Sequence, residues 1–396
     1  MKRRLVFLLT AVAWIQCTPA ARTPALSNLS VLQALADSGK ELPRPRLPAG
    51  SDTNAALAYY DFGTRWNAPT DTAEMSLFWA SRIDPSWAEP LYARLFNTLQ
   101  ALEHDMYETY WKTYSPRAVS NVSLTPRQTQ VIDSLQQLAW QINPFLFSDL
   151  EFRHGVPGRW GDTVHDAWLA YSQKRFAVAD TLFAALLKKH PRAVELRLMR
   201  AKALFYLGKF DSTVAELQAA RDTVNQDVAK KLSPILPSVE MFDFAIGIAR
   251  VQQDDFPSAR AAFERALTQN LAFYWAHTRL AGSALELHDT ATALAELEMA
   301  TQLEGRDPVL RLYRGVVLQT AGRFADAELD LQKAIELDPY YAEPYYFLAT
   351  NRQALGDTVS AIGYYRQFLR RAARAHPYRP QTEQQLRALG VRPDSM

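Results

Sequence analysis

The 396-residue chain has little cysteine and little glycine, and no long apolar run follows its first twenty residues. Cys17 is the only cysteine, so no disulfide can form within the chain. The fifteen glycines are dispersed and form no phosphate-binding loop. No run reaches the ~20 apolar residues that a membrane-spanning helix needs. We therefore expect neither a disulfide-stabilised fold, nor a nucleotide-binding loop, nor a membrane-spanning bundle.

The chain also lacks an excess of either charge. Its formal net charge is +2, and Lys2, Arg3 and Arg4 supply three of the positive charges. A nucleic-acid-binding protein needs a cation for each phosphate that it contacts. We therefore expect no nucleic-acid partner. The hydrophobic fraction of 48% is sufficient for a buried core and excludes a wholly disordered chain.

The N-terminus has the pattern of an export signal. The basic "MKRR" precedes eleven mostly apolar residues, "LVFLLTAVAWI", and then the small-residue region "QCTPAA". This pattern predicts a signal peptide over residues 1–20 and a mature protein in the periplasm or attached to the outer membrane of the cell envelope. The alternative, a hydrophobic first helix of a cytosolic protein, is disfavoured by the three adjoining basic residues.

Cys17 occupies the place of the lipidated cysteine in bacterial lipoprotein precursors, which the N-terminus resembles in part. The preceding Trp14, Ile15 and Gln16 fit that family's lipobox poorly. Two alternatives stay open: lipidation at Cys17, which would tether the protein to a membrane, and cleavage after Ala20 or Ala21.

One nine-residue motif occurs twice. "DPYYAEPYY" at 338–346 matches "DPSWAEPLY" at 84–92 in six positions. Small and bulky residues also recur along the chain with a period of 34, which indicates tandem copies of one unit. The recurring triplets are Ala73–Leu77–Ala80, Ala179–Phe183–Leu186, Thr213–Leu217–Ala220, Ala259–Phe263–Ala266, Ala293–Leu297–Ala300, Ala327–Leu331–Ala334 and Ala361–Tyr365–Phe368.

This spacing predicts pairs of antiparallel helices, because small residues let two helices approach while a bulky neighbour fills the hole between them. Gly208, Gly322 and Gly356 share one column between the paired helices, where a left-handed C-cap is needed. Pro85, Pro191 and Pro339 end three of the copies. The predicted fold class is therefore all-α, an α-solenoid of stacked antiparallel helix pairs.

The period, the small and aromatic columns and the closing prolines resemble the tetratricopeptide repeat (TPR) family. The resemblance covers residues 54–87, 160–227 and 240–375. It implies a TPR superhelix that acts as a non-enzymatic scaffold for protein or peptide partners, without a cofactor, a metal or a catalytic residue.

The spacing of the columns also divides the chain. Thr213 and Ala259 are 46 residues apart instead of 34, which indicates an insertion, and the gap between Ala73 and Ala179 leaves room for two degenerate copies. The predicted parts are a signal peptide (1–20), a flexible Pro-rich spacer (21–53), a TPR copy with degenerate helical repeats (54–159), the main array (160–375, insertion near 228–239) and a C-terminal capping segment (376–396).

The family resemblance implies a concave wall built from the second, fifth, ninth and twelfth positions of each copy. The predicted partner groove is Met241, Phe244, Ile248, Val251, Trp275, Thr278, Val309, Leu312, Val316, Tyr346 and Thr350. This mostly apolar wall suits an amphipathic helix or an apolar extended peptide. The alternative is that these side chains pack on neighbouring helices or on the chain's own N-terminal segment. If the groove is open, replacing Phe244 and Leu312 by aspartate should abolish partner capture and preserve helicity.

Arg366, Arg370 and Arg374 are spaced four residues apart, which predicts a basic stripe on one helix face. Such a stripe is either a solvated face of the helix that caps the array or a contact for anionic lipid or an acidic partner.

The seven histidines, at 104, 154, 165, 190, 277, 288 and 376, form no zinc-binding pattern, and no nucleophile motif is present. Nothing in the sequence argues for an enzyme. Two rival functions stay open: an active site within residues 88–159 with the repeats as a targeting arm, and a self-assembling structural protein whose repeats stack between chains. The oligomeric state is not specified by the sequence.

Overall fold

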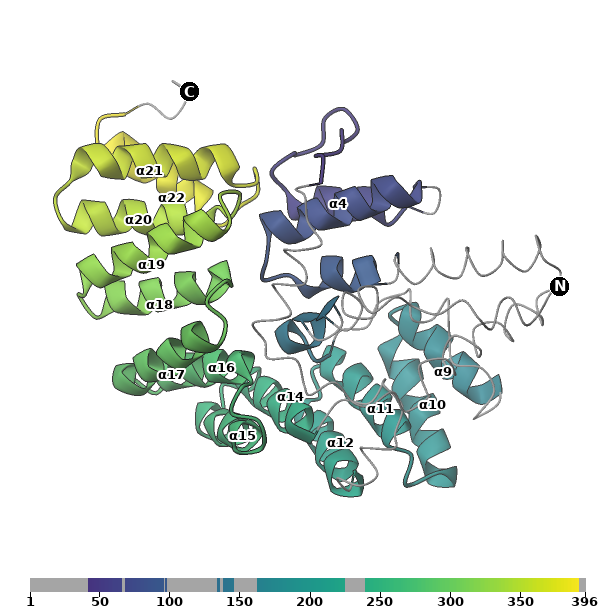
Figure 1. Ribbon diagram of the computed structural model, residues 1–396. Helices are drawn as coiled ribbons and strands as arrows, with labels where there is room; N and C mark the ends of the chain where they lie inside the picture. Colours follow the sequence, from purple (N-terminus) through teal and green to yellow (C-terminus); the bar gives the residue numbers. More distant parts are fainter. Residues whose placement is uncertain are drawn as a thin grey trace, which may run out of the picture.

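The computed structural model describes residues 42–65, 68–95, 97, 134–135, 138–145, 162–224 and 239–391. Within these ranges all regular structure is helical, which confirms the predicted all-α solenoid (Figure 1). The signal peptide, Cys17 and residues 228–238 of the predicted insertion lie outside the described ranges. The labelled helices are α3 (Ala56–Gly63), α4 (Thr70–Ile83), α9 (Asp162–Ser172), α10 (Phe176–Lys189), α11 (Val194–Tyr206), α12 (Phe210–Thr223), α14 (Val239–Val251), α15 (Phe256–Gln269), α16 (Tyr274–Glu286), α17 (Thr290–Leu303), α18 (Pro308–Thr320), α19 (Phe324–Leu337), α20 (Glu343–Ala354), α21 (Thr358–Arg371) and α22 (Arg379–Ala388).

Consecutive helices pack in pairs, and the second helix of each pair carries one predicted triplet. All seven triplets are buried, with no member more than 6% exposed. The small residues matter because the paired helices approach closely. A Cβ added at Gly315 of α18, for example, would lie 2.8 Å from Cγ of Leu331 on α19. The predicted register of the repeats is therefore confirmed.

The turn between paired helices repeats with the same backbone. Gly208, Gly322 and Gly356 have φ angles of +70°, +75° and +78°, as a left-handed C-cap requires. The same column is occupied in other copies by Lys174, Asp254 and His288, which also have positive φ. Gly390 adopts +79° directly after α22, 34 residues beyond Gly356. The capping segment thus begins as the first helix of a further copy, a detail that the glycine spacing could have shown.

Ion pairs at equivalent positions join the helices. On α18, Arg311 and Arg314 both bind the buried Asp330 of α19, with the closest contacts at 3.1 Å and 2.5 Å. Arg197 and Arg200 of α11 bind Glu216 of α12 in the same way, at 2.8 Å and 2.6 Å. These contacts satisfy carboxylates that the close packing has removed from water.

The array curves from α9 to α22, and the N-terminal helix α4 lies beside its C-terminal half (Figure 1). The two copies of the nine-residue motif meet here, since Arg82 before the first motif binds Asp338 of the second at 2.7 Å. The motifs have the same local structure. Asp84 Oδ1 accepts from the backbone N–H of Ser86 at 3.1 Å, and Asp338 Oδ1 accepts from that of Tyr340 at 3.0 Å. Each motif ends one helix and starts the next, which explains why the sequence repeats.

Candidate partner-binding groove

The predicted wall lies on the first helices of the main array, and none of its eleven residues is exposed to solvent. The buried members are Phe244, Trp275, Thr278, Val309, Leu312 and Tyr346. The half-buried members are Met241, Ile248, Val251, Val316 and Thr350. Other parts of the protein therefore cover the wall residues.

Much of the cover comes from an N-terminal part of the chain, here called the inner segment, consisting of residues 88–95, 134–135 and 138–145. Leu91 and Leu138 of the inner segment share one continuous apolar cluster with Trp275 and Leu312 of the wall. The Arg279 guanidinium of α16 donates to the carbonyl of Ile142 at 3.3 Å. These contacts agree with the intramolecular alternative stated for the wall, while its role toward a partner stays a prediction.

The burial of Phe244 and Leu312 changes the expected effect of the two aspartate substitutions. The Phe244 side chain is fully buried, with its ring centroid 4.7 Å from that of Phe273 and 5.7 Å from that of Phe263. Leu312 is 4% exposed and belongs to the same cluster. Because an unpaired charge is costly in such a core, the structure favours loss of helicity in this double variant instead, and the effect on partner capture stays a prediction.

At the C-terminal end of the wall the cover comes from the segment around α22. The ring of Tyr346 stacks on that of Tyr378, with centroids 4.6 Å apart and an interplanar angle of 17°. Thr350 accepts a hydrogen bond from Gln319 of the preceding copy at 2.9 Å. Neighbouring parts of the array therefore use these wall positions for their own packing.

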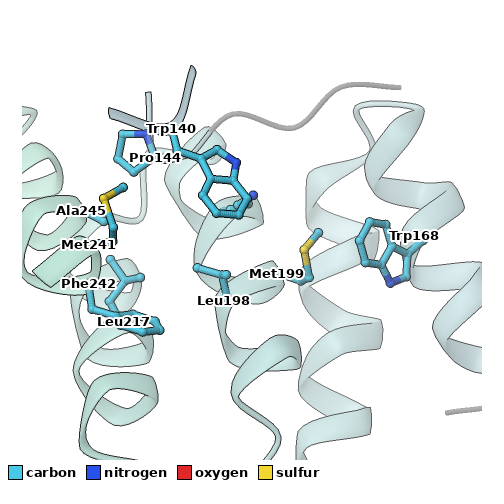
Figure 2. Close-up of a pocket in the computed structure, with 10 residues that line it drawn as sticks. Trp140, Pro144, Trp168, Leu198, Met199, Leu217, Met241, Phe242 and Ala245 are labelled. Atoms are coloured by element: carbon cyan, nitrogen blue, oxygen red, sulfur yellow. The ribbon is translucent and has the colours of Figure 1, made fainter. Parts of the chain in front are cut away.

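A small cavity of about 50 Å³ remains on the wall of the first copies (Figure 2). Its lining comes from α9, α11, α12 and α14 together with two residues of the inner segment. The lining residues are Trp140, Pro144, Trp168, Leu198, Met199, Lys202, Leu217, Met241, Phe242 and Ala245. Trp168, Leu198 and Lys202 occupy the fifth or ninth position of their copies. The same positions that define the wall from residue 240 onward therefore also identify these three residues in the two preceding copies.

The cavity is chemically suited to an aliphatic side chain. The side chains that line it are apolar except for the Lys202 amine and the indole N–H groups of Trp140 and Trp168. The indole N–H of Trp140 has no hydrogen-bond acceptor among the described residues. A single water needs roughly 10–15 Å³ by the same measure of volume, so the cavity has room for a few heavy atoms. A leucine, isoleucine or methionine side chain is apolar and has only a few heavy atoms, so it matches both the lining and the volume of the cavity.

The basic stripe is only partly helical. Helix α21 ends at Arg371, and Ala372 is extended, so the expectation that Arg374 shares a helix face with Arg366 and Arg370 is wrong. Beyond this point the backbone N–H of Arg374 donates to Asp52 Oδ2 at 2.6 Å. The role of the three arginines toward lipid or an acidic partner stays a prediction.

Two of the described histidines pair with glutamates, and two neighbouring acids have raised pKa values because they are buried. His277 lies 2.6 Å from Glu296, and His376 lies 3.1 Å from Glu343. Burial raises the pKa of Glu304 to about 7 and that of Asp307 to about 6. Asp307 caps α18 by accepting from the N–H of Val309 at 2.8 Å.

Neither a metal-binding cluster nor a membrane-spanning helix is found within the described ranges. No group of three His, Cys, Asp or Glu residues in these ranges could hold a metal ion. None of the helices in these ranges combines the length and the apolar character needed to cross a membrane.

Comparison with protein families agrees with the geometry. Residues 167–228, 244–303 and 278–342 match the family model "Tetratricopeptide repeat". No curated protein matches the chain.

Several solved structures are similar to parts of the array. MamA from Desulfovibrio magneticus RS-1 is 16% identical, with 45% of this chain and 93% of MamA covered and a TM-score of 0.39. YrrB, described as a TPR protein with an unusual peptide-binding site, is 17% identical over 47% of this chain and 90% of YrrB, with a TM-score of 0.37. The C-terminal part of a TPR repeat-containing protein from Cytophaga hutchinsonii is 15% identical, over 57% of this chain and 82% of that protein, with a TM-score of 0.44.

Proposed function

We propose that this protein is a non-enzymatic TPR scaffold that binds protein or peptide partners outside the cytoplasm. The TPR-type repeats support the general role, because stacked helix pairs present an extended inner wall to a ligand. The export pattern of residues 1–20 supports the location. No catalytic residue and no cofactor is part of this proposal.

The observation that carries the proposal is the cavity at Trp168, Leu198 and Met241. It lies on the wall positions that the inner segment leaves partly uncovered, and it accepts carbon better than charge. The bound partner segment is therefore apolar at one position and places an aliphatic side chain in the cavity. Apolar pockets of this kind supply much of the binding energy in peptide recognition.

The test fills the cavity. Leu198→Trp adds a large side chain to a half-buried wall position, and Leu329→Trp makes the same change at an exposed position of α19. The full chain and both variants are immobilised and exposed to a detergent extract of the native cell envelope. We expect the same proteins to be captured by the full chain and by Leu329→Trp, and to be lost from Leu198→Trp.

Circular dichroism must first show equal helicity for the three proteins. Capture of identical proteins by all three would contradict binding through the cavity. A membrane tether through Cys17 belongs to the same proposal, and mass spectrometry of the mature N-terminus decides between a lipidated Cys17 and cleavage after Ala20 or Ala21.

A further inference from the structure

Helix α21, in the last helix pair of the array, carries arginine where the preceding copies carry acids or neutral polar residues (Figure 1). Arg366 and Arg370 occupy two columns of the 34-residue repeat. On α15, α17 and α19 the same columns hold Glu264 and Thr268, Glu298 and Gln302, and Gln332 and Glu336. The repeat itself therefore does not require arginine at these positions.

The arginines of the basic stripe also lack acidic partners. Arg370 and Arg374 are exposed and Arg366 is half-buried, and within the described ranges none of the three side chains takes part in an ion pair. Arginines inside the array behave differently, since Arg314 binds carboxylates of both α17 and α19. The three positive charges of the stripe are therefore not neutralised by the array.

The acids nearest to the stripe along the chain or in contact with it are engaged elsewhere. No acid occurs between Asp357 and Glu383. Asp357 caps the N-terminus of α21 and lies 3.5 Å from Arg352 of α20. Asp52 accepts from the backbone N–H of Arg374 and not from its guanidinium. The surface of α21 thus keeps its excess of positive charge.

The same side of α21 carries exposed aliphatic carbon. Val359 is 83% exposed, the highest value among the large apolar side chains of the described residues. Val359, Gly363, Arg366 and Arg370 follow one another at steps of four, three and four residues, so they share one helix face. No atom lies within 4 Å of a Cβ built on Gly363, so this face is open. Leu355, just before α21, is also 51% exposed.

We propose that this part of the surface, here called the α21 face and consisting of Val359, Arg366, Arg370 and Arg374, lies on an anionic membrane. The guanidinium groups bind lipid phosphates, which they match in charge and in hydrogen-bonding geometry. Val359 enters the boundary between the headgroups and the acyl chains, as apolar side chains of surface-lying helices do. The opposite side of α21 is buried in the array through Ala361, Tyr365 and Phe368, so the helix lies flat on the membrane.

The N-terminal part of the chain reaches the array beside the α21 face. Asn54 donates to the carbonyl of Arg370 at 2.8 Å, and Asp52 accepts from the N–H of Arg374. A single acyl chain gives only marginal membrane binding, and a basic patch supplies a second attachment. The tether through Cys17 that belongs to the proposed function would therefore act together with the α21 face, although the face does not depend on it.

The expected strength follows from the number of arginines. Each arginine close to an anionic surface tightens binding by about fivefold, so three of them give an effect on the order of a hundredfold at low ionic strength. Salt screens the attraction between the guanidinium groups and the lipid phosphates, so binding weakens as the ionic strength rises.

The test measures binding of the full chain to lipid vesicles by co-sedimentation. Every protein used carries Cys17→Ser, so that no acyl chain contributes. The vesicles contain either phosphatidylcholine alone or equal parts of phosphatidylcholine and phosphatidylglycerol. We expect the chain to bind the anionic vesicles at least about tenfold more tightly than the neutral ones. The triple variant Arg366→Gln, Arg370→Gln and Arg374→Gln should lose most of this preference.

A matched control removes the same charge from other places. Arg175, Arg192 and Arg306 are exposed, and replacing all three by glutamine changes the net charge equally. This control should keep the preference for anionic vesicles. Equal loss of binding in both triple variants, or no preference in the chain with all its arginines, would overturn the proposal.

Two further measurements separate a membrane from an acidic protein. Val359→Ser should weaken binding to the anionic vesicles roughly threefold, because it removes the apolar side chain that enters the boundary. A labelled polyglutamate peptide, followed by fluorescence anisotropy, should bind more weakly than the vesicles. Tight binding of the peptide without binding of the vesicles would assign the arginines to an acidic protein and refute the proposal. Neither measurement involves the cavity or an acyl chain, so a negative result leaves the proposed function standing.

Discussion

Two N-terminal parts of the chain lie against the same array: the inner segment, and the helices α3 and α4 with the preceding residues 42–55, here called the clasp. They are held by different forces. The inner segment buries Leu91, Leu95, Leu138 and Ile142 to 6% exposure or less, and each such side chain is worth roughly 1.5–3 kcal/mol. The contacts of the clasp with the array include the Trp79–Tyr340 ring pair, the Arg82–Asp338 ion pair and hydrogen bonds from Asn54 and to Asp52. The ring pair is worth about 0.5–1.5 kcal/mol, and an ion pair about 0–1 kcal/mol. The inner segment is thus part of the apolar core, whereas the clasp meets the array mainly through polar and aromatic groups.

This difference shows how a repeat protein can use its own concave wall. In the copies from residue 240 onward the apolar wall has an occupant from the same chain, so its apolar character reflects core packing. Within the part of the chain that the structure describes, a cavity lies on the wall beside Trp168 and Leu198, which are both half-buried. An apolar stripe at wall positions therefore indicates burial, and the tertiary structure decides which segment provides the cover.

The largest effect is expected from two buried charges. Phe244→Asp combined with Leu312→Asp places two carboxylates in the cluster that holds the inner segment. We expect loss of helicity and of cooperative unfolding, measured by circular dichroism during thermal denaturation. The control is Leu57→Asp at an exposed position of the clasp, which should keep the helicity of the full chain. A folded double variant would show that the wall is accessible after all.

The next effect concerns the apolar contact of the inner segment. Leu91→Ala should lower the free energy of unfolding by about 2–5 kcal/mol, because it removes buried carbon and leaves a cavity. Leu57→Ala, on an exposed face of α3, should change it by less than about 0.5 kcal/mol. Urea denaturation measures both values. Equal small effects would mean that the inner segment is held as loosely as the clasp.

A pH-dependent effect should be confined to the array. Glu304 is fully buried and its pKa is raised to about 7, so below that pH the folded state holds a proton that the unfolded state lacks. The free energy of unfolding therefore increases as the pH falls from about 7 toward 4.5, the ordinary glutamate value. Glu304→Gln should remove this slope and stabilise the protein at pH 8 by up to roughly 3 kcal/mol.

Chemical denaturation at several pH values measures that slope. Asp307, with its pKa raised to about 6, titrates in the lower part of the range, so the interval above pH 6 reports mainly on Glu304. If the free energy of unfolding of Glu304→Gln still depends on pH in the same way, the proton taken up on folding belongs to another group. Exchange rates of α3 and α4 should not differ between the two proteins, because the pKa of Glu304 is shifted by its burial and by Arg306 and Asp307, none of which belongs to α3 or α4.

The smallest effect belongs to the clasp. Tyr340→Ala removes the ring that meets Trp79 and lies near two guanidinium groups, at a cost of about 1 kcal/mol. We expect faster amide exchange in α4 and almost no change in the urea midpoint of the full chain. Val359→Ala at an exposed site of α21 is the control. A midpoint that falls as far as in Leu91→Ala would show that the clasp belongs to the same cooperative core.

The sequence by itself determined the repeat and its register. The 34-residue columns required close helix pairs, and residues such as Ala259, Leu297 and Ala334 are buried as that pattern predicts. Gly322 and Gly356 marked left-handed turns because few other residues adopt that backbone conformation without strain. These features depend on contacts within a copy or between adjacent copies, where the spacing along the chain fixes which side chains meet.

Only the tertiary structure decided what lies inside the curve of the array. Arg82 and Asp338 are 256 residues apart, and Asn54 and Arg370 are separated by 316. No local pattern specifies such pairs, since they depend on the curvature accumulated over all the intervening copies. Positions in the repeat identified the wall residues, but they did not identify the segment of the chain that covers them. A periodic pattern shows that a face is apolar, and the path of the whole chain determines whether a partner or the protein itself covers it.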